Sequence, residues 1–211
     1  LNNVLGGYTG ALIEFFNTSA TGITIQGNNV GVGADGVSQI VSSNTEDLIY
    51  FGGNPRAYNQ MLIGGSGAGQ GNMIAFSNRS GVRLQSNGSD IQVIGNTIRN
   101  NTRNGIYLID ATSAAFIGNR IFSNGMLGID LGENGVTQND AGDGDSGQNN
   151  LLNFPAITAV NVRGPNELAY NFTLDVPSAA SGYRVEFFAN TSGDSSAFGE
   201  GERYLGHIDI V

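Results

Sequence analysis

Residues 95–108 read GNTIRNNTRNGIYL, and residues 118–131 read GNRIFSNGMLGIDL. Both segments begin with Gly-Asn, carry an asparagine at the seventh position and end in Gly-Ile-x-Leu. Residues 71–84, GNMIAFSNRSGVRL, follow nearly the same plan, so the unit recurs in steps of 24 and 23 residues. Self-similarity at a fixed period of this length indicates a repeat architecture.

Each repeat contains three short strand-like runs. An earlier Gly-Asn unit starts at Gly27, 44 residues before Gly71, which is close to two steps of 22. A further asparagine column lies between the two ends of the unit, at Asn78, Asn101 and Asn124. Alternating runs precede the Gly-Asn turns, at residues 23–25, 91–93 and 114–116. Three strands per 22–24 residues, joined by Gly and Asn turns, describe one coil of a parallel β-helix.

The apolar pattern predicts which side chains face inward. Side chains alternate between the two faces of a strand. The inward positions of three successive coils are therefore Val82 and Leu84, Ile106 and Leu108, and Ile129 and Leu131. Asparagines at equal turn positions are expected to stack about 4.8 Å apart and to bond amide to amide.

The composition excludes several classes of function. Among 211 residues there are 33 glycines, 26 asparagines and no cysteine, so disulfides and thiolate metal sites are absent. All nine basic residues are arginine, and the net charge of −9 disfavours a nucleic-acid partner. No apolar run approaches the roughly 20 residues of a membrane span. The single histidine, His207, rules out a multi-histidine zinc site.

Several motifs resemble those of right-handed parallel β-helix repeat proteins of pectin-lyase-like fold, and most closely those of large bacterial surface or secreted proteins. The resemblance is carried by LIGG at 62–65, GIDLG at 128–132, NFP at 153–155, YRVEFFAN at 183–190 and GEG at 199–201. It implies an extracellular or cell-surface location and a small β-sandwich-like domain after the helix. These proteins are mostly without an assigned biochemical activity.

We therefore expect an all-β chain in two parts. Residues 1–152 form a right-handed parallel β-helix of about five coils that ends in an acidic linker or cap. Residues 153–211 form a small antiparallel β domain, immunoglobulin-like and incomplete, with strands expected at 157–162, 168–176, 183–188 and 204–211. The stretch 31–47 is irregular and is either a degenerate coil or a loop insertion.

Three outward residues suggest a binding face. Arg83, Tyr107 and Asp130 hold the same place in three successive coils, so they should line up about 5 Å apart. Arginine, tyrosine and a carboxylate side by side are typical of a sugar-binding surface. The alternative is a surface ladder that only stabilises the sheet.

The acidic linker suggests a calcium site. Asp140, Asp143, Asp145 and Asn149 offer oxygen ligands within ten residues, and Ca²⁺ prefers six to eight oxygens from such a loop. The full EF-hand pattern is not met, because its twelfth position counted from Asp143 is Phe154 instead of glutamate. The alternative is a solvated acidic loop.

The sequence favours a non-catalytic extracellular or cell-surface module, structural or adhesive, that contacts a polysaccharide or a cell-surface glycan and is stabilised by calcium. No catalytic residue is assigned, because the pectinase patterns Asn-Thr-Asp, Asp-Asp and His-Gly do not occur. A polysaccharide lyase or hydrolase is the first alternative. The second is a filament subunit that self-associates through open β-helix ends or strand donation. Since the chain starts in mid-repeat, we expect it to be a piece of a longer protein.

Overall fold

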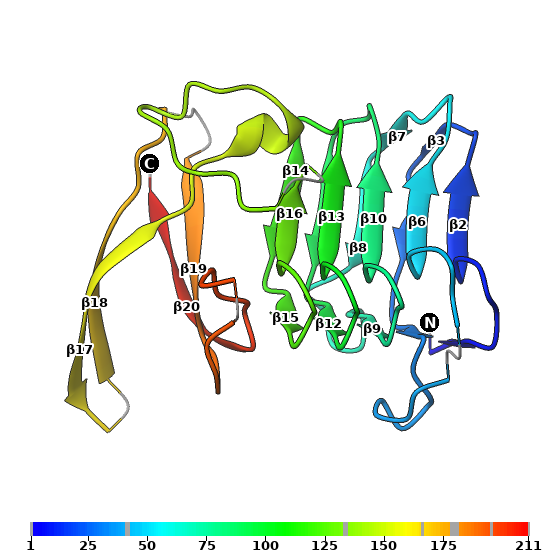
Figure 1. Cartoon of the computed structure of the whole chain (residues 1–211), viewed down its shortest axis with the longest axis horizontal. Coiled ribbons are helices and arrows are strands. Elements are labelled where there is room, and N and C mark those ends of the chain that lie inside the picture. Colours follow the sequence, from blue (N-terminus) through cyan, green and yellow to red (C-terminus); the bar gives the residue numbers. More distant parts are fainter. Residues whose placement is uncertain are drawn as a thin grey trace.

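The computed structural model describes residues 2–40, 43–132, 135–165, 167–177, 182–194 and 196–210. Figure 1 shows an all-β molecule in two parts: a stack of short parallel strands, and two antiparallel hairpins beside its C-terminal end. The predicted architecture, a parallel β-helix followed by a small antiparallel β unit, is confirmed.

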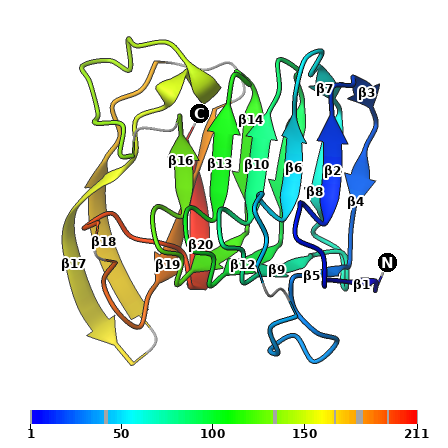
Figure 2. The ribbon, with the colours of Figure 1, turned by 45° about the vertical axis from the view of Figure 1, so that its right-hand side comes forward.

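Three parallel sheets run along the stack (Figures 1 and 2). The first sheet has the order β1 (Val4–Leu5), β5 (Asn29–Val30), β9 (Met73–Ala75), β12 (Thr97–Arg99) and β15 (Arg120–Phe122). The second has the order β2 (Ile13–Phe16), β6 (Ile49–Gly52), β10 (Val82–Gln85), β13 (Ile106–Ile109) and β16 (Ile129–Leu131). The third contains β4 (Thr24–Ile25), β8 (Met61–Gly64), β11 (Ile91–Ile94) and β14 (Ala114–Ile117). A short pair joins β3 (Ala20–Thr21) to β7 (Tyr58–Asn59).

The core lies between the sheets and is continuous along the stack. Val82, Ile106 and Ile129 are register partners on neighbouring strands, so the sequence repeats are rungs in space. Fully burying one such aliphatic side chain stabilises the fold by about 1.5–3 kcal/mol. Ile129 is nevertheless 37% exposed, because it belongs to the last rung and has no following strand of the second sheet to cover it. Other buried members of the core include Ile49, Phe51, Ile63, Ile74, Leu84, Val93, Ile98 and Leu108.

A ladder of buried asparagines joins successive rungs at the turn before the first sheet. The backbone N–H and the side-chain Nδ2 of each asparagine donate to Oδ1 of the next, at 2.9–3.1 Å. The members are Asn28, Asn72, Asn96 and Asn119. The predicted amide-to-amide stacking is therefore confirmed.

A second ladder lies at the turn between the first and second sheets. Asn101 donates from N–H and Nδ2 to Oδ1 of Asn124, at 3.1 and 2.9 Å. On the preceding rung the column is occupied by Ser77, whose N–H donates to Asn101. The placement of Asn78 in this column was wrong, because the strands that follow are offset by 24 residues at this step, and the next step is 23.

Residues 31–47 connect β5 to β6 and contribute no rung of their own. Gly27-Asn28 and Gly71-Asn72 are neighbours in space, since Asn29 pairs with Met73. The 44-residue interval is therefore one step, not two. Within it, Val32 and Gln39 form an isolated antiparallel bridge in the loop that projects below the stack in Figure 1. Of the two alternatives, the structure has the loop insertion.

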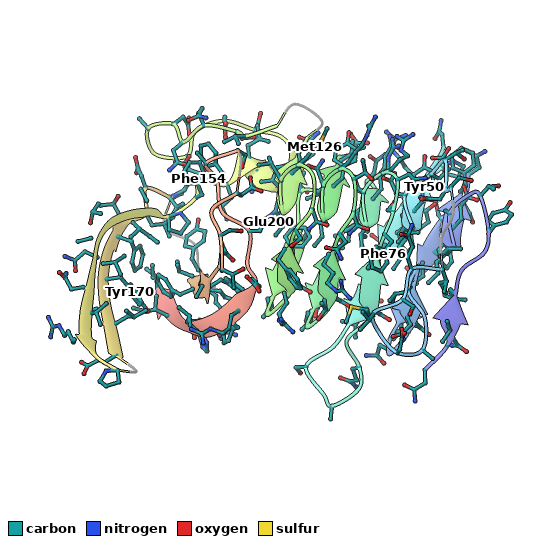
Figure 3. All side chains as sticks on the ribbon, turned by 60° about the horizontal axis from the view of Figure 1, so that its bottom comes forward. Tyr50, Phe76, Met126, Phe154, Tyr170 and Glu200 are labelled. Atoms are coloured by element: carbon teal, nitrogen blue, oxygen red, sulfur yellow. The ribbon has the colours of Figure 1, made fainter. Side chains whose placement is uncertain are left out.

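The C-terminal part consists of two separate hairpins after a short 3₁₀ helix, Gln148–Leu151. One pairs β17 (Ala156–Gly164) with β18 (Glu167–Thr173), and the other pairs β19 (Tyr183–Ala189) with β20 (Arg203–Ile210). The ring of Phe187 joins them, 4.0 Å from the ring centre of Tyr170 and 5.6 Å from that of Phe172 (Figure 3). These are the four expected strands, where an immunoglobulin-like sandwich has about seven. No helix in the described ranges is long and apolar enough to cross a membrane.

The second hairpin covers the C-terminal end of the stack. Ile121 on β15 and Gly201 exchange two backbone hydrogen bonds of 2.8 and 2.7 Å. Glu200 accepts hydrogen bonds from the N–H and Nδ2 of Asn124, so a carboxylate stands where the next asparagine of the second ladder would be (Figure 3). Glu186 on β19 accepts from the N–H of Gly118 at 2.8 Å. These groups satisfy donors that have no further rung to bond.

We predict that Asn96→Ala destabilises the protein by about 2–4 kcal/mol, because it leaves two buried donors of Asn72 without an acceptor. Urea unfolding followed by circular dichroism measures the change. Asn87→Ala is the control, since this asparagine is exposed and lies outside both ladders. Equal stability of the two variants would contradict the role of the ladder.

We predict that Glu200→Gln changes the pH dependence of stability. Partial burial raises the pKa of Glu200 above its ordinary value, so this group stabilises the fold in acid, and the stabilisation is lost as the pH rises. Glutamine keeps an acceptor for Asn124 and does not ionise. The melting temperature of Glu200→Gln should therefore gain on that of the wild type between about pH 4 and pH 7.

The control is Glu202→Gln in the same loop. Hydrogen bonds from the N–H and hydroxyl of Thr191 lower the pKa of Glu202, so this carboxylate stabilises the fold above its ordinary pKa and the stabilisation is lost in acid. Relative to the wild type, Glu202→Gln should lose stability over the same rise in pH. Parallel shifts in the two variants would contradict the assignment of Glu200 as a desolvated cap.

Candidate functional site

One row of side chains crosses the outer face of the second sheet. The register places Arg83 beside Tyr107 and Tyr107 beside Asp130, so the structure brings these three residues together in the predicted order. Tyr50 and Glu14 extend the row. The Arg83 guanidinium lies over both neighbouring rings, 4.9 Å from the centre of Tyr50 and 5.5 Å from that of Tyr107. Arginine over an aromatic face is a stabilising cation–π arrangement.

The outward side chains of this row are not open to solvent. Tyr107 is 5% exposed and Asp130 is 4% exposed. Asp130 accepts a hydrogen bond of 3.1 Å from Nδ2 of Asn104, and Oδ1 of Asn104 accepts from the N–H of Leu127. Asp130 is thus held by the turns that lead into β13 and β16.

A cleft of about 560 Å³, hereafter the arginine cleft, opens beside these turns. Its walls come from the ends of three rungs, from the linker and from the loop between β19 and β20. Tyr107 and Asp130 lie on the wall, while Arg83 stands behind it. The other polar side chains of the wall are Asp47, Arg79, Ser80, Arg103, Asn104, Asp194 and Ser196. Concave sites with a few convergent polar groups are the usual form of ligand pockets.

Asp47 is the most deeply buried charged group of the cleft. It is 2% exposed, and its Oδ1 accepts a hydrogen bond of 2.8 Å from the N–H of Ser80. Ion pairs of 3.9 and 4.0 Å join it to Arg79 and Arg83. Burial raises the pKa of the Asp47 carboxyl, while the Ser80 N–H and the two arginines act to lower it. Oδ2 of Asp47 is buried and has no hydrogen-bond partner in the structure.

The sequence patterns missed Asp47, Arg79 and Arg103. A signal was present for the two arginines, which lie 24 residues apart, the same offset as the β10 and β13 register. Asp47 had no such signal, because it ends the 31–47 insertion, whose relation to the repeat was undecided.

The two carboxylates on the wall of the second sheet are far apart. Asp47 precedes β6 and Asp130 is on β16, three strand spacings away along the sheet, or roughly 14 Å. Inverting glycosidases hold their carboxyl pair about 6.5–9.5 Å apart, and retaining ones about 5–5.5 Å. The arrangement suits binding better than paired acid–base chemistry.

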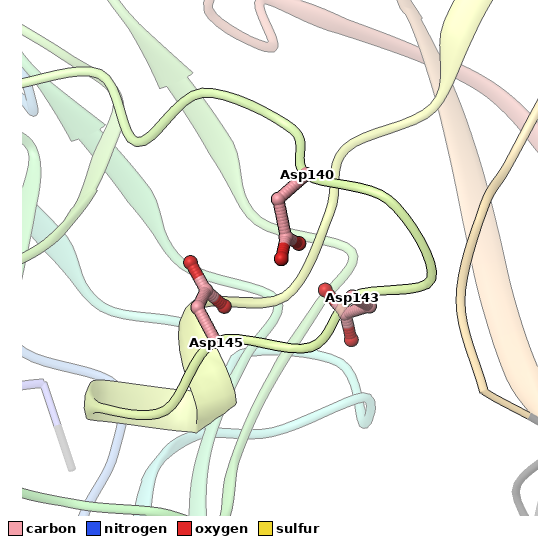
Figure 4. Close-up of side chains that lie close together, drawn as sticks. All are labelled: Asp140, Asp143 and Asp145. Atoms are coloured by element: carbon pink, nitrogen blue, oxygen red, sulfur yellow. The ribbon is translucent and has the colours of Figure 1, made fainter.

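The acidic linker brings three of its four predicted ligands together. Oxygens of Asp140, Asp143 and Asp145 lie within 4.8 Å of one another (Figure 4), and among the described residues no other acidic or histidine group is so arranged. Ligands of one Ca²⁺ at 2.3–2.6 Å are at most about 5 Å apart, so the spacing fits a cation. Burial, and then the charges of Asp140 and Asp143, raise the pKa of Asp145.

Asn149 lies elsewhere. Its Oδ1 accepts a hydrogen bond of 2.9 Å from the N–H of Ala114 at the start of β14, and its own N–H donates to Ala111. The 3₁₀ helix thereby fastens the linker to the stack. Within the cluster, Asp143 accepts from the N–H of Asn153, whereas Oδ1 of Asp145 is shielded and has no hydrogen-bond partner.

A larger groove of about 690 Å³ runs along the turns between the third and first sheets. Glycines form much of its floor, and β19 and β20 close one end. The polar side chains there already bind protein groups: Arg184 pairs with Asp209, and Tyr204 bonds His207. The arginine cleft, with buried polar atoms still unpartnered, is the better candidate for a ligand.

Comparison with protein-family models, with curated proteins and with solved structures yields no match for this chain. The function therefore has to be argued from the chemistry of the site, because one fold can carry many activities.

Proposed function

We propose that the protein is a non-catalytic module of the cell surface or extracellular space that binds a glycan in the arginine cleft. The observation that carries this proposal is the cleft itself, where Tyr107 and Asp130 line a concave wall with arginine and asparagine side chains. On this proposal the stack is a right-handed β-helix of the pectin-lyase-like type, and it acts as a rigid, adhesive support for the cleft.

The chemistry of the wall supports a sugar ligand. Sugar hydroxyl groups both donate and accept hydrogen bonds, and the wall offers carboxylate acceptors together with guanidinium and amide donors. Tyr107 adds an aromatic edge next to Asp130. Because the rungs fix these groups on a sheet, little ordering entropy is lost when a ligand binds.

The two alternatives receive less support. A lyase or hydrolase would need reacting groups closer together than Asp47 and Asp130. A filament that grows head to tail needs two complementary ends, whereas the hairpin around Glu200 and Gly201 covers the last rung. Neither alternative accounts for the buried polar groups of the cleft.

We also propose that Asp140, Asp143 and Asp145 hold a Ca²⁺ ion that stabilises the linker. The support is the convergence of three carboxylates with no basic side chain between them in the sequence. A bound cation would relieve the repulsion that raises the pKa of Asp145. It would also hold the linker close to β18, because the N–H of Gly142 donates to Asp175.

We predict that Asp130→Asn weakens glycan binding at least tenfold without unfolding the protein, because the amide keeps the shape of the side chain but not its charge. A glycan array identifies binders, and titration calorimetry compares the variants. Tyr8→Ala is the control, since Tyr8 is 63% exposed and lies outside the cleft. Absence of binding on the array, or equal binding by Asp130→Asn, would falsify the proposal.

We predict that Asp145→Asn has opposite effects with and without calcium. In EDTA it should be neutral or stabilising, because it reduces repulsion with Asp140 and Asp143. In calcium it should abolish the stabilisation by the ion, which for a ligand at 100 times its Kd is about 2.7 kcal/mol, or about 5–10 °C in melting temperature. Scanning calorimetry of both states tests this.

The control for the calcium site is Asp90→Asn, an exposed acid outside the linker. It should leave the calcium-dependent shift unchanged. If calcium does not raise the melting temperature of the wild type, the linker is a solvated acidic loop.

A further inference from the structure

Three of the nine arginines of this acidic chain gather at one end of the arginine cleft. Arg79 and Arg103 line it on adjacent rungs, and the N–H of Arg103 donates to the carbonyl of Arg79 at 3.0 Å. Arg83 stands directly behind, against Tyr107. Adjacent rungs are about 4.8 Å apart, so like charges are held close together here.

A single buried carboxylate opposes these three charges. Asp47 pairs with Arg79 and Arg83 only at the limit of ion-pair distance, 3.9 and 4.0 Å. Set against three guanidinium groups, it leaves a charge of about +2 at this end. The Nε atoms of Arg79 and Arg83 are buried and bond no acceptor in the structure. Buried donors of this kind are costly unless an acceptor arrives.

The opposite end of the cleft has the reverse character. Asp130, held by Asn104, and Asp194 from the β19–β20 loop lie there. These groups accept hydrogen bonds from hydroxyls. The cleft is therefore polarised, with cationic donors at the Asp47 end and acceptors at the Asp130 end.

We infer that the Asp47 end of the cleft binds a sulfate ester, so that the ligand is a sulfated glycan. This inference rests on the proposed function and specifies its ligand. A sulfate ester presents three terminal oxygens and can accept from guanidinium groups on two rungs at once. A sugar carboxylate has two oxygens, which a single guanidinium fork satisfies. The sugar hydroxyls then lie toward Asp130 and Asn104.

The test compares matched polymers on the intact chain. Dextran sulfate is measured against dextran, and chondroitin sulfate against its desulfated form, which keeps the carboxylates. Biolayer interferometry should show at least tenfold tighter binding of each sulfated polymer, weakening as salt rises. Arg103→Gln should remove at least tenfold of that affinity, and Arg163→Gln, an exposed arginine on β17, should remove none.

Each further outcome decides between the two levels of the proposal. Arg103 is exposed, so its variant should melt as the wild type does, and that is checked first. If an unsulfated glycan binds equally well and Asp130→Asn abolishes that binding while Arg103→Gln does not, glycan binding stands and the sulfate site is wrong. If Arg103→Gln and Arg163→Gln weaken binding equally, the sulfate site is also wrong. If no polymer or array glycan binds, both are wrong.

Discussion

The whole stack depends on hydrogen bonds between a turn asparagine and the same turn on the next rung. Backbone groups of short parallel strands point along the stack, so each rung can be satisfied only by its neighbours. At the turns, where the strand ladder is interrupted, Asn96 bonds Asn119 ahead of it and accepts from Asn72 behind it. This interaction fixes the register, and with the register it fixes which side chains form columns.

The columns differ in a way that separates structure from function. The first ladder repeats one residue type on rung after rung, as an interaction between identical groups requires. The outer row of the second sheet instead changes at each step, from Glu14 and Tyr50 through Arg83 and Tyr107 to Asp130. Such a row is not needed for stacking. It gives each position along the cleft its own chemistry on a backbone of constant spacing.

The sequence allowed good predictions wherever the repeat was regular. From Gly71 to Leu131 the 23–24-residue spacing identified the strand partners, and with them the row of Arg83, Tyr107 and Asp130. It failed at residues 31–47, since an insertion breaks the count and hid Asp47. It also could not find the bond of Glu200 to Asn124, because these residues are 76 apart and belong to no common period. Asn149 fits an alternating oxygen pattern, but its amide is used to hold β14.

The direction of the ladders explains the chemistry of the cap. Each asparagine donates forward and accepts from behind, so the last rung has donors in excess. Asn124 therefore needs an acceptor, and the carboxylate of Glu200 supplies one without offering a donor of its own. Glu186 does the same for the N–H of Gly118. An end with excess donors and an end with excess acceptors are not interchangeable, so two copies of the same end cannot satisfy each other. The desolvation of Glu200, which raises its pKa, is the cost of ending the stack in this way.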